Sequence, residues 1–129
     1  TAGEAPVAAT LALEWSLNLS GGGGNPAAFY ESGRGRRVRF DGSGRIARSE
    51  AGRLAFGNDD LGLRITARAA PAAEVAWASI DTVSLSEAGA ERTHQGSCLV
   101  FAWPLRLAAG ASCTVSVSMA VRVARDAAG

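Results

Sequence analysis

The stretch CTVSVSMAVRV, residues 113–123, decides the expected fold. Every second position in it is apolar, and these positions are Cys113, Val115, Val117, Met119, Val121 and Val123. The positions between them carry small or polar side chains, including one arginine. A period of two over this length indicates a β-strand with one buried face and one wet face. The sequence therefore predicts a long closing strand, preceded by a turn in LAAGAS, residues 107–112.

The start of the chain carries the same alternation. Its apolar positions are Val7, Ala9, Leu11, Leu13, Trp15, Leu17 and Leu19. Four consecutive glycines, an asparagine and a proline follow, which is the composition of a flexible joint. We therefore expect an N-terminal strand in residues 1–20, a Gly-rich hinge in 21–26 and a β-sandwich body in 27–129, together forming a single domain. The first strand is expected to pair either within its own sheet or with a neighbouring subunit.

The middle of the chain predicts shorter strands separated by turns. Residues 41–44 and 57–60 have turn composition, and residues 86–96 are expected to be the longest polar loop. Helical periodicity is weak, with at most a helical turn in 69–77. The expected strands lie in residues 36–40, 45–47, 53–56, 61–68 and 97–107, and residues 75–85 supply one strand or two with a kink near Asp81. This spacing favours an all-β fold, an antiparallel Ig-like or jelly-roll-type β-sandwich of about seven to nine strands.

Composition excludes several classes of function. The 129 residues carry a formal net charge of +1, so no general electrostatic attraction to nucleic acid is expected. All thirteen basic residues are arginine, which excludes a lysine Schiff base or a P-loop. A single histidine, His94, excludes a multi-histidine metal site, and no apolar run approaches a membrane span. We expect no cofactor, no metal site and no catalytic site.

Cys98 and Cys113 are the only cysteines. A disulfide between them would close a loop of about 15 residues and place the protein outside a reducing cytosol. A regular hairpin about residues 108–111 would set Cys113 opposite Arg106, too far from Cys98 for a bond. The disulfide therefore requires a break in the strand at Pro104, and two buried thiols are the alternative.

One cluster of side chains suggests ligand binding. The residues are Arg34, Arg36, Arg37 and Arg39, with Tyr30 nearby in sequence and Trp77 as a candidate aromatic surface. They would suit an acidic or sulfated glycan. In the simpler interpretation, Arg37 and Arg39 flank a buried Val38 on a wet strand face and protect a sheet edge.

The closing segment resembles a known family. LAAGASCTVSVS is similar to the closing strand of bacterial surface Ig-like repeats, including modules of the abnormal-spindle and hydin type. The resemblance implies a structural role and Cys98 as the partner of Cys113. The first strand with its glycine hinge separately resembles the donor strand of fimbrial subunits, which implies that Val7, Ala9, Leu11, Leu13, Trp15 and Leu17 fill a groove in a neighbouring subunit.

The leading functional hypothesis is therefore a secreted, cell-surface structural subunit of a fimbria-like or pilus-like filament or of an adhesin stalk, which self-associates by strand addition. A carbohydrate-binding module is the first alternative, and it predicts an exposed Trp77. A phage or viral capsid or tail accessory protein is the second alternative.

Overall fold

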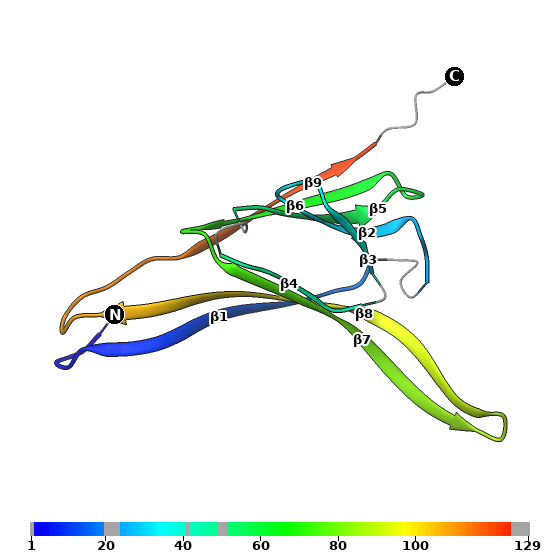
Figure 1. Ribbon diagram of the computed structural model, residues 1–129, viewed down its shortest axis with the longest axis horizontal. Coiled ribbons are helices and arrows are strands. Elements are labelled where there is room, and N and C mark those ends of the chain that lie inside the picture. The colour runs from blue at the N-terminus through cyan, green and yellow to red at the C-terminus, as the bar shows by residue number, and fades with distance from the viewer. Residues whose placement is uncertain (1, 20–23, 41, 49–51, 125–129) are drawn as a thin grey trace.

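The computed structural model describes residues 2–19, 24–40, 42–48 and 52–124, and these form nine strands in two antiparallel sheets (Figure 1). The four-stranded sheet has the order β1 (Val7–Leu17), β8 (Gly89–Leu107), β7 (Glu74–Ser86), β4 (Gly44–Ile46). The five-stranded sheet has the order β3 (Arg37–Arg39), β2 (Ala28–Ser32), β5 (Leu54–Asn58), β6 (Leu63–Ala70), β9 (Ser116–Val123). The predicted all-β sandwich is confirmed. A helix capable of spanning a bilayer is absent from the described part of the chain.

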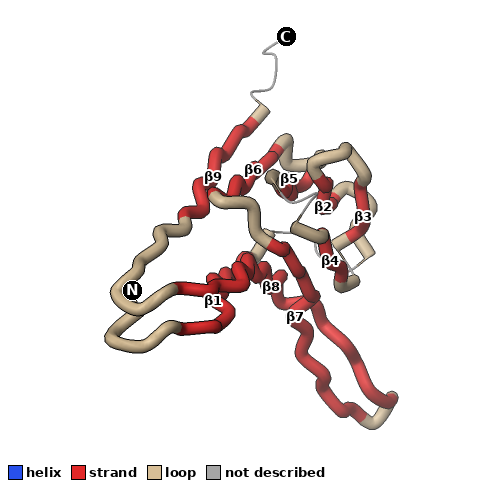
Figure 2. The backbone as a smooth tube through the Cα atoms, turned by 60° about the vertical axis from the view of Figure 1, so that its left-hand side comes forward, coloured by secondary structure: helices blue, strands red, loops and turns tan. Residues whose placement is uncertain are grey.

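The long strand β8 is an interior strand of the four-stranded sheet. Its residues 97–102 pair with β1 on one side and β7 on the other. Within this doubly paired segment Leu99 and Phe101 are fully buried. Residues 89–96 pair with β7 alone, and together with the end of β7 they form an arm that projects from the sandwich (Figure 2).

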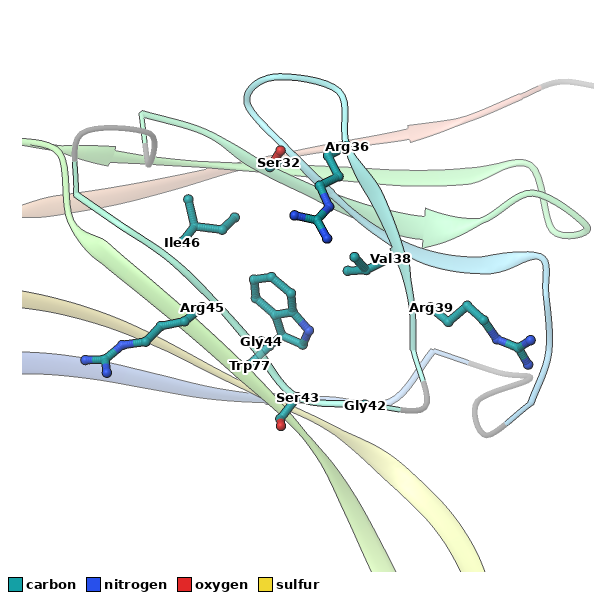
Figure 3. A pocket seen from close by; sticks show the side chains of 10 residues that line it. All are labelled: Ser32, Arg36, Val38, Arg39, Gly42, Ser43, Gly44, Arg45, Ile46 and Trp77. Atoms are coloured by element: carbon teal, nitrogen blue, oxygen red, sulfur yellow. The ribbon is translucent and has the colours of Figure 1, made fainter.

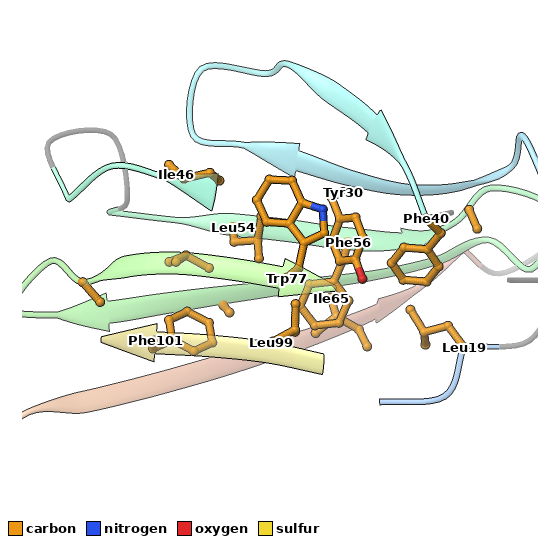
Figure 4. Close-up of a cluster of buried hydrophobic side chains, with 14 of the residues drawn as sticks. Leu19, Tyr30, Phe40, Ile46, Leu54, Phe56, Ile65, Trp77, Leu99 and Phe101 are labelled. Carbon is orange, nitrogen blue, oxygen red and sulfur yellow. The ribbon is translucent and has the colours of Figure 1, made fainter. Parts of the chain in front are cut away.

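The core lies between the two sheets and is rich in aromatic side chains (Figure 4). Its largest fully buried members include Trp103, Tyr30, Phe56 and Phe101. The indole nitrogen of Trp103 donates a hydrogen bond to the backbone oxygen of Pro71 at 2.7 Å, so its polar atom is satisfied. Burial of side chains of this size contributes about 1.5–3 kcal/mol each to folding.

The first strand belongs to its own domain. β1 pairs with β8 of the same chain over its whole length, from Val7 opposite Leu107 to Leu17 opposite Ser97. Leu13, Trp15 and Leu17 pack on the core, whereas Val7 and Leu11 lie exposed near the end of the sheet. In this structure the first strand therefore pairs within its own sheet, which is the alternative to the donor-strand expectation. Residues 21–23 of the expected hinge, and residue 20 before it, lie outside the described residues.

Two expectations about residues 69–96 are wrong. Residues 86–96 are not a loop, because the β7–β8 hairpin closes with a turn at residues 87–88, followed by Gly89, whose φ is 118°. The kink expected near Asp81 is confirmed by a shift in strand register between Ile80 and Asp81. The predicted helical turn in 69–77 is also absent, since β6 and β7 occupy most of that range.

The closing strand does not form a hairpin with the strand before it. β9 pairs with β6 in the five-stranded sheet, whereas β8 lies in the other sheet. Cys98 lies in β8 and Cys113 lies exposed before β9, and both are free thiols. The structure therefore contradicts the expected disulfide, and the free-thiol alternative agrees with it, although Cys113 is exposed and not buried.

Candidate functional site

A pocket of about 480 Å³ opens at one edge of the sandwich (Figure 3). It lies between β3 and β4, which are the edge strands of opposite sheets. The side chains of Val38 from β3, Ile46 from β4 and Trp77 from β7 give it an apolar floor. The remaining lining residues are Ser32, Arg36, Arg39, Gly42, Ser43, Gly44 and Arg45. Its volume falls within the usual range for small-molecule sites.

Trp77 is fixed from two sides. Its ring stacks on Tyr30, with ring centroids 5.0 Å apart and an interplanar angle of 29°. Gly44 is its cross-strand partner, and a β-carbon at residue 44 would lie 2.2 Å from Cζ2 of the indole. The indole therefore occupies the space above Gly44, and only a glycine there permits this arrangement.

The polar groups of the pocket are arginines and serines. Arg45 forms an ion pair with Glu74, and Nη2 of Arg39 donates a hydrogen bond to the backbone oxygen of Gly24 at 3.0 Å. The side chain of Arg36 points into the pocket above Trp77, whereas Arg39 and Arg45 point away from it (Figure 3). These groups are hydrogen-bond donors, and the serine hydroxyls also accept.

The structure separates the predicted ligand-binding residues. Arg36, Arg39 and Trp77 line the pocket, whereas Arg34 and Arg37 do not. Tyr30 is fully buried and serves as the support of Trp77. Trp77 itself is only 8 % exposed, so the expected exposed aromatic surface is wrong, and Trp77 is a pocket floor.

Arg37 has a structural role on the far face of β3. Its Nε donates to Glu31 at 3.0 Å and its Nη1 donates to Asp59 at 2.7 Å. Its guanidinium also lies 3.9 Å from the ring centre of Phe29, a favourable cation–π distance. This agrees with the interpretation that Arg37 lies on a wet strand face beside Val38.

Sequence reasoning missed the contribution of the short strand β4. Gly44, Arg45 and Ile46 enter the pocket because β4 pairs with β7 and not with β3. The sequence predicts a turn in residues 41–44, of which Asp41 lies outside the described residues. The glycines of this segment are a sequence signal for close backbone approach, but the partner that approaches is set by the topology.

A second polar cluster, at the base of the projecting arm, lacks the geometry of a serine-hydrolase relay. Ser79 and Asp81 both approach Nδ1 of His94, at 2.8 Å and 3.4 Å respectively. A serine-hydrolase relay needs the serine on the imidazole nitrogen opposite the aspartate. Among the described residues, no group of histidine, cysteine and acidic side chains has the arrangement of a metal site.

Comparison with known proteins identifies one relationship. A model of the family described as "Alpha-amylase/4-alpha-glucanotransferase, C-terminal" matches residues 2–117. No curated protein and no solved structure gives a significant match. The prediction of a fimbrial, filament or adhesin subunit is therefore wrong, because the matching family is a part of carbohydrate-active enzymes. The resemblance to surface Ig-like modules holds only at the level of a β-rich domain.

Proposed function

Because the chain belongs to the family of α-amylase/4-α-glucanotransferase C-terminal domains, we propose that it is a non-catalytic domain that binds carbohydrate for an enzyme acting on α-glucans. The observation that carries the proposal is the pocket between β3 and β4, where donors surround an apolar floor that includes Trp77. The carbohydrate-binding alternative from the sequence thus replaces the filament hypothesis.

The chemistry of the pocket suits a sugar. A pyranose ring presents an apolar C–H surface on its faces and hydroxyl groups around its rim, so it needs apolar contact below and hydrogen bonds at the side. Val38, Ile46 and the exposed part of Trp77 supply the apolar contact. The hydroxyls of Ser32 and Ser43 and the guanidinium of Arg36 supply hydrogen-bonding groups for the sugar hydroxyls.

The support of the pocket is rigid, which favours binding. Val38 and Ile46 belong to strands of opposite sheets, and Trp77 is held between Tyr30 and the backbone of Gly44. A pre-organised site loses less conformational entropy when a ligand binds. The geometry of the floor is therefore expected to be the same before and after a sugar enters.

Titration with maltoheptaose, a linear α-1,4-linked glucan, tests this proposal. Isothermal calorimetry on the purified chain, with sugar up to about 10 mM, detects dissociation constants near 1 mM. We expect saturable binding and a change in tryptophan fluorescence. Ser43→Tyr, at the exposed mouth of the pocket, is expected to abolish binding, whereas Ser84→Tyr on the projecting arm leaves it unchanged. Absence of saturable binding, or equal binding by both variants, would refute the proposal.

A further inference from the structure

The lining of the pocket is strongly asymmetric in charge. Arg36, Arg39 and Arg45 contribute to it, and no acidic side chain is among the described residues that line it. One of these arginines, Arg45, forms an ion pair with Glu74, which is not among the lining residues. The chain as a whole is nearly neutral, so this local excess of positive charge is a property of the pocket.

The three arginines differ in how far they are already engaged. Arg45 is paired with Glu74, and Arg39 binds the backbone oxygen of Gly24. The guanidinium of Arg36 has no polar side-chain or backbone partner within the described ranges. It is also the one whose side chain points into the pocket, above Trp77 and beside Val38 (Figure 3). Arg36 therefore presents its donors to any ligand on the pocket floor.

A guanidinium in this position matches an anionic group better than a hydroxyl. Its planar fork donates two parallel hydrogen bonds to a phosphate or carboxylate, and such charge-assisted bonds are roughly twice as strong as neutral ones. A neutral sugar hydroxyl accepts a hydrogen bond from Arg36 but leaves its charge unpaired. The hydroxyls of Ser32 and Ser43, on the same lining, are available to the remaining oxygens of the ligand.

We infer that the pocket between β3 and β4 selects a glucan that carries an anionic substituent, a phosphate ester or a carboxylate, with Arg36 as the residue that recognises the charge. The sugar ring lies on the floor formed by Val38, Ile46 and Trp77, and the substituent is directed toward Arg36. This inference rests on the proposed function, since it adds a charge preference to the same carbohydrate site.

The decisive comparison uses one maltodextrin preparation in two forms: carrying phosphate monoesters, and after enzymatic removal of the phosphate. We expect the phosphorylated form to bind about tenfold more tightly at low salt, as for a hydrogen bond to a charged group. The preference is expected to decrease at about 1 M salt, where charges are screened within about 3 Å. Arg36→Gln is expected to remove the preference, and Arg68→Gln, at an exposed site outside the pocket, to retain it.

Two further probes define the source of the charge. Maltobionate, which carries a carboxylate, is expected to bind more tightly than maltose and to lose this advantage in Arg36→Gln. Inorganic phosphate is expected to compete only weakly, because it lacks the sugar ring. Competition by inorganic phosphate as strong as by the phosphorylated maltodextrin would overturn the inference, because the pocket would then be a simple anion site.

The outcomes also separate this inference from the proposed function. Equal binding of the phosphorylated and dephosphorylated maltodextrins by the unmodified chain would refute the charge preference and leave the carbohydrate site intact. Absence of binding by either form would refute both. An Arg36→Gln variant that keeps its preference for the phosphorylated form would refute the role of Arg36.

Discussion

The six-membered ring of Trp77 covers the α-carbon of Gly44, its cross-strand partner on β4. A β-carbon at residue 44 would meet Cζ2, Cε2 and Cη2 of the indole at 2.2 Å, 2.6 Å and 2.9 Å. The ring has little freedom to retreat, because it stacks on the buried Tyr30. The pair therefore connects the edge strand β4 to the core and sets the floor of the pocket at the same time.

Gly44→Ala is expected to destabilise the domain by about 1–3 kcal/mol, the usual cost of forcing a methyl group into a well-packed site. Urea unfolding followed by tryptophan fluorescence measures the change. Gly42→Ala is the matched control, since a β-carbon at residue 42 meets nothing within 4 Å. If the two variants were equally stable, the close contact between Gly44 and Trp77 would not exist in solution.

The fold was largely predictable because its long strands alternate strictly. Residues 7–17 and 116–123 form strands where the period of two predicted them, with Leu13, Trp15, Val117 and Met119 against the core. The prediction failed at residues 86–96, which are polar on both faces. That part of the β7–β8 hairpin projects beyond the sandwich and needs no apolar face, so its pattern carries no strand signal.

The candidate site was only partly predictable, because it is assembled from edges of both sheets. The arginine cluster and Trp77 were identified from residue type, but which arginine enters the pocket depends on the alternation along β3. Arg37 and Arg39 share one face of that strand, while Val38 and Arg36 take the other side. The contribution of β4 follows from its pairing with β7, which no local pattern indicates.

Tyr30 is the only tyrosine of the chain, and its phenol is expected to ionise at a higher pH in the folded than in the unfolded state. Burial raises the pKa of Tyr30 from 10.0 to about 12, because the phenolate is poorly solvated in the core. The folded state thus binds the proton more tightly than the unfolded state. The associated stability is complete below pH 10 and is lost as the pH rises toward 12.

Ultraviolet absorbance of the phenolate near 295 nm checks this directly. The native chain is expected to show almost no tyrosinate at pH 10.5, whereas the chain in concentrated urea titrates near pH 10. The urea sample is the control, since it contains the same tyrosine without the core. Coincident titration curves in buffer and in urea would show that Tyr30 is exposed to solvent.

Glu31 is expected to stabilise the domain in a pH-dependent way. It is held by Arg64, Arg37 and Arg53, and the hydrogen bond from Arg64, followed by that from Arg37, lowers the pKa of Glu31 below 4.5. Because the folded-state pKa is the lower one, the stabilisation is complete above pH 4.5 and is lost as the pH falls through the folded value. Glu31→Gln is expected to cost about 2 kcal/mol at pH 7.

Urea unfolding of both proteins between pH 7 and pH 3 measures this dependence. The difference between wild type and Glu31→Gln is expected to shrink at the acid end, where Glu31 is protonated in the wild type. Glu87→Gln, at the exposed tip of the projecting arm, is the matched control and should not change stability. A constant difference across the whole range would mean that the charge of Glu31 contributes nothing.

The projecting arm and the core give opposite expectations for the same substitution. Leu85 lies near the tip of the β7–β8 hairpin and is 86 % exposed, whereas Leu99 lies on β8 where that strand is paired on both sides and is fully buried. Leu99→Ala is expected to cost about 2–5 kcal/mol through lost burial and a cavity. Leu85→Ala is expected to change the free energy of unfolding by less than about 0.5 kcal/mol, because no packed contacts are removed.

Urea unfolding of the two variants measures both values. A loss of stability in Leu85→Ala as large as in Leu99→Ala would show that the arm folds back onto the sandwich in solution.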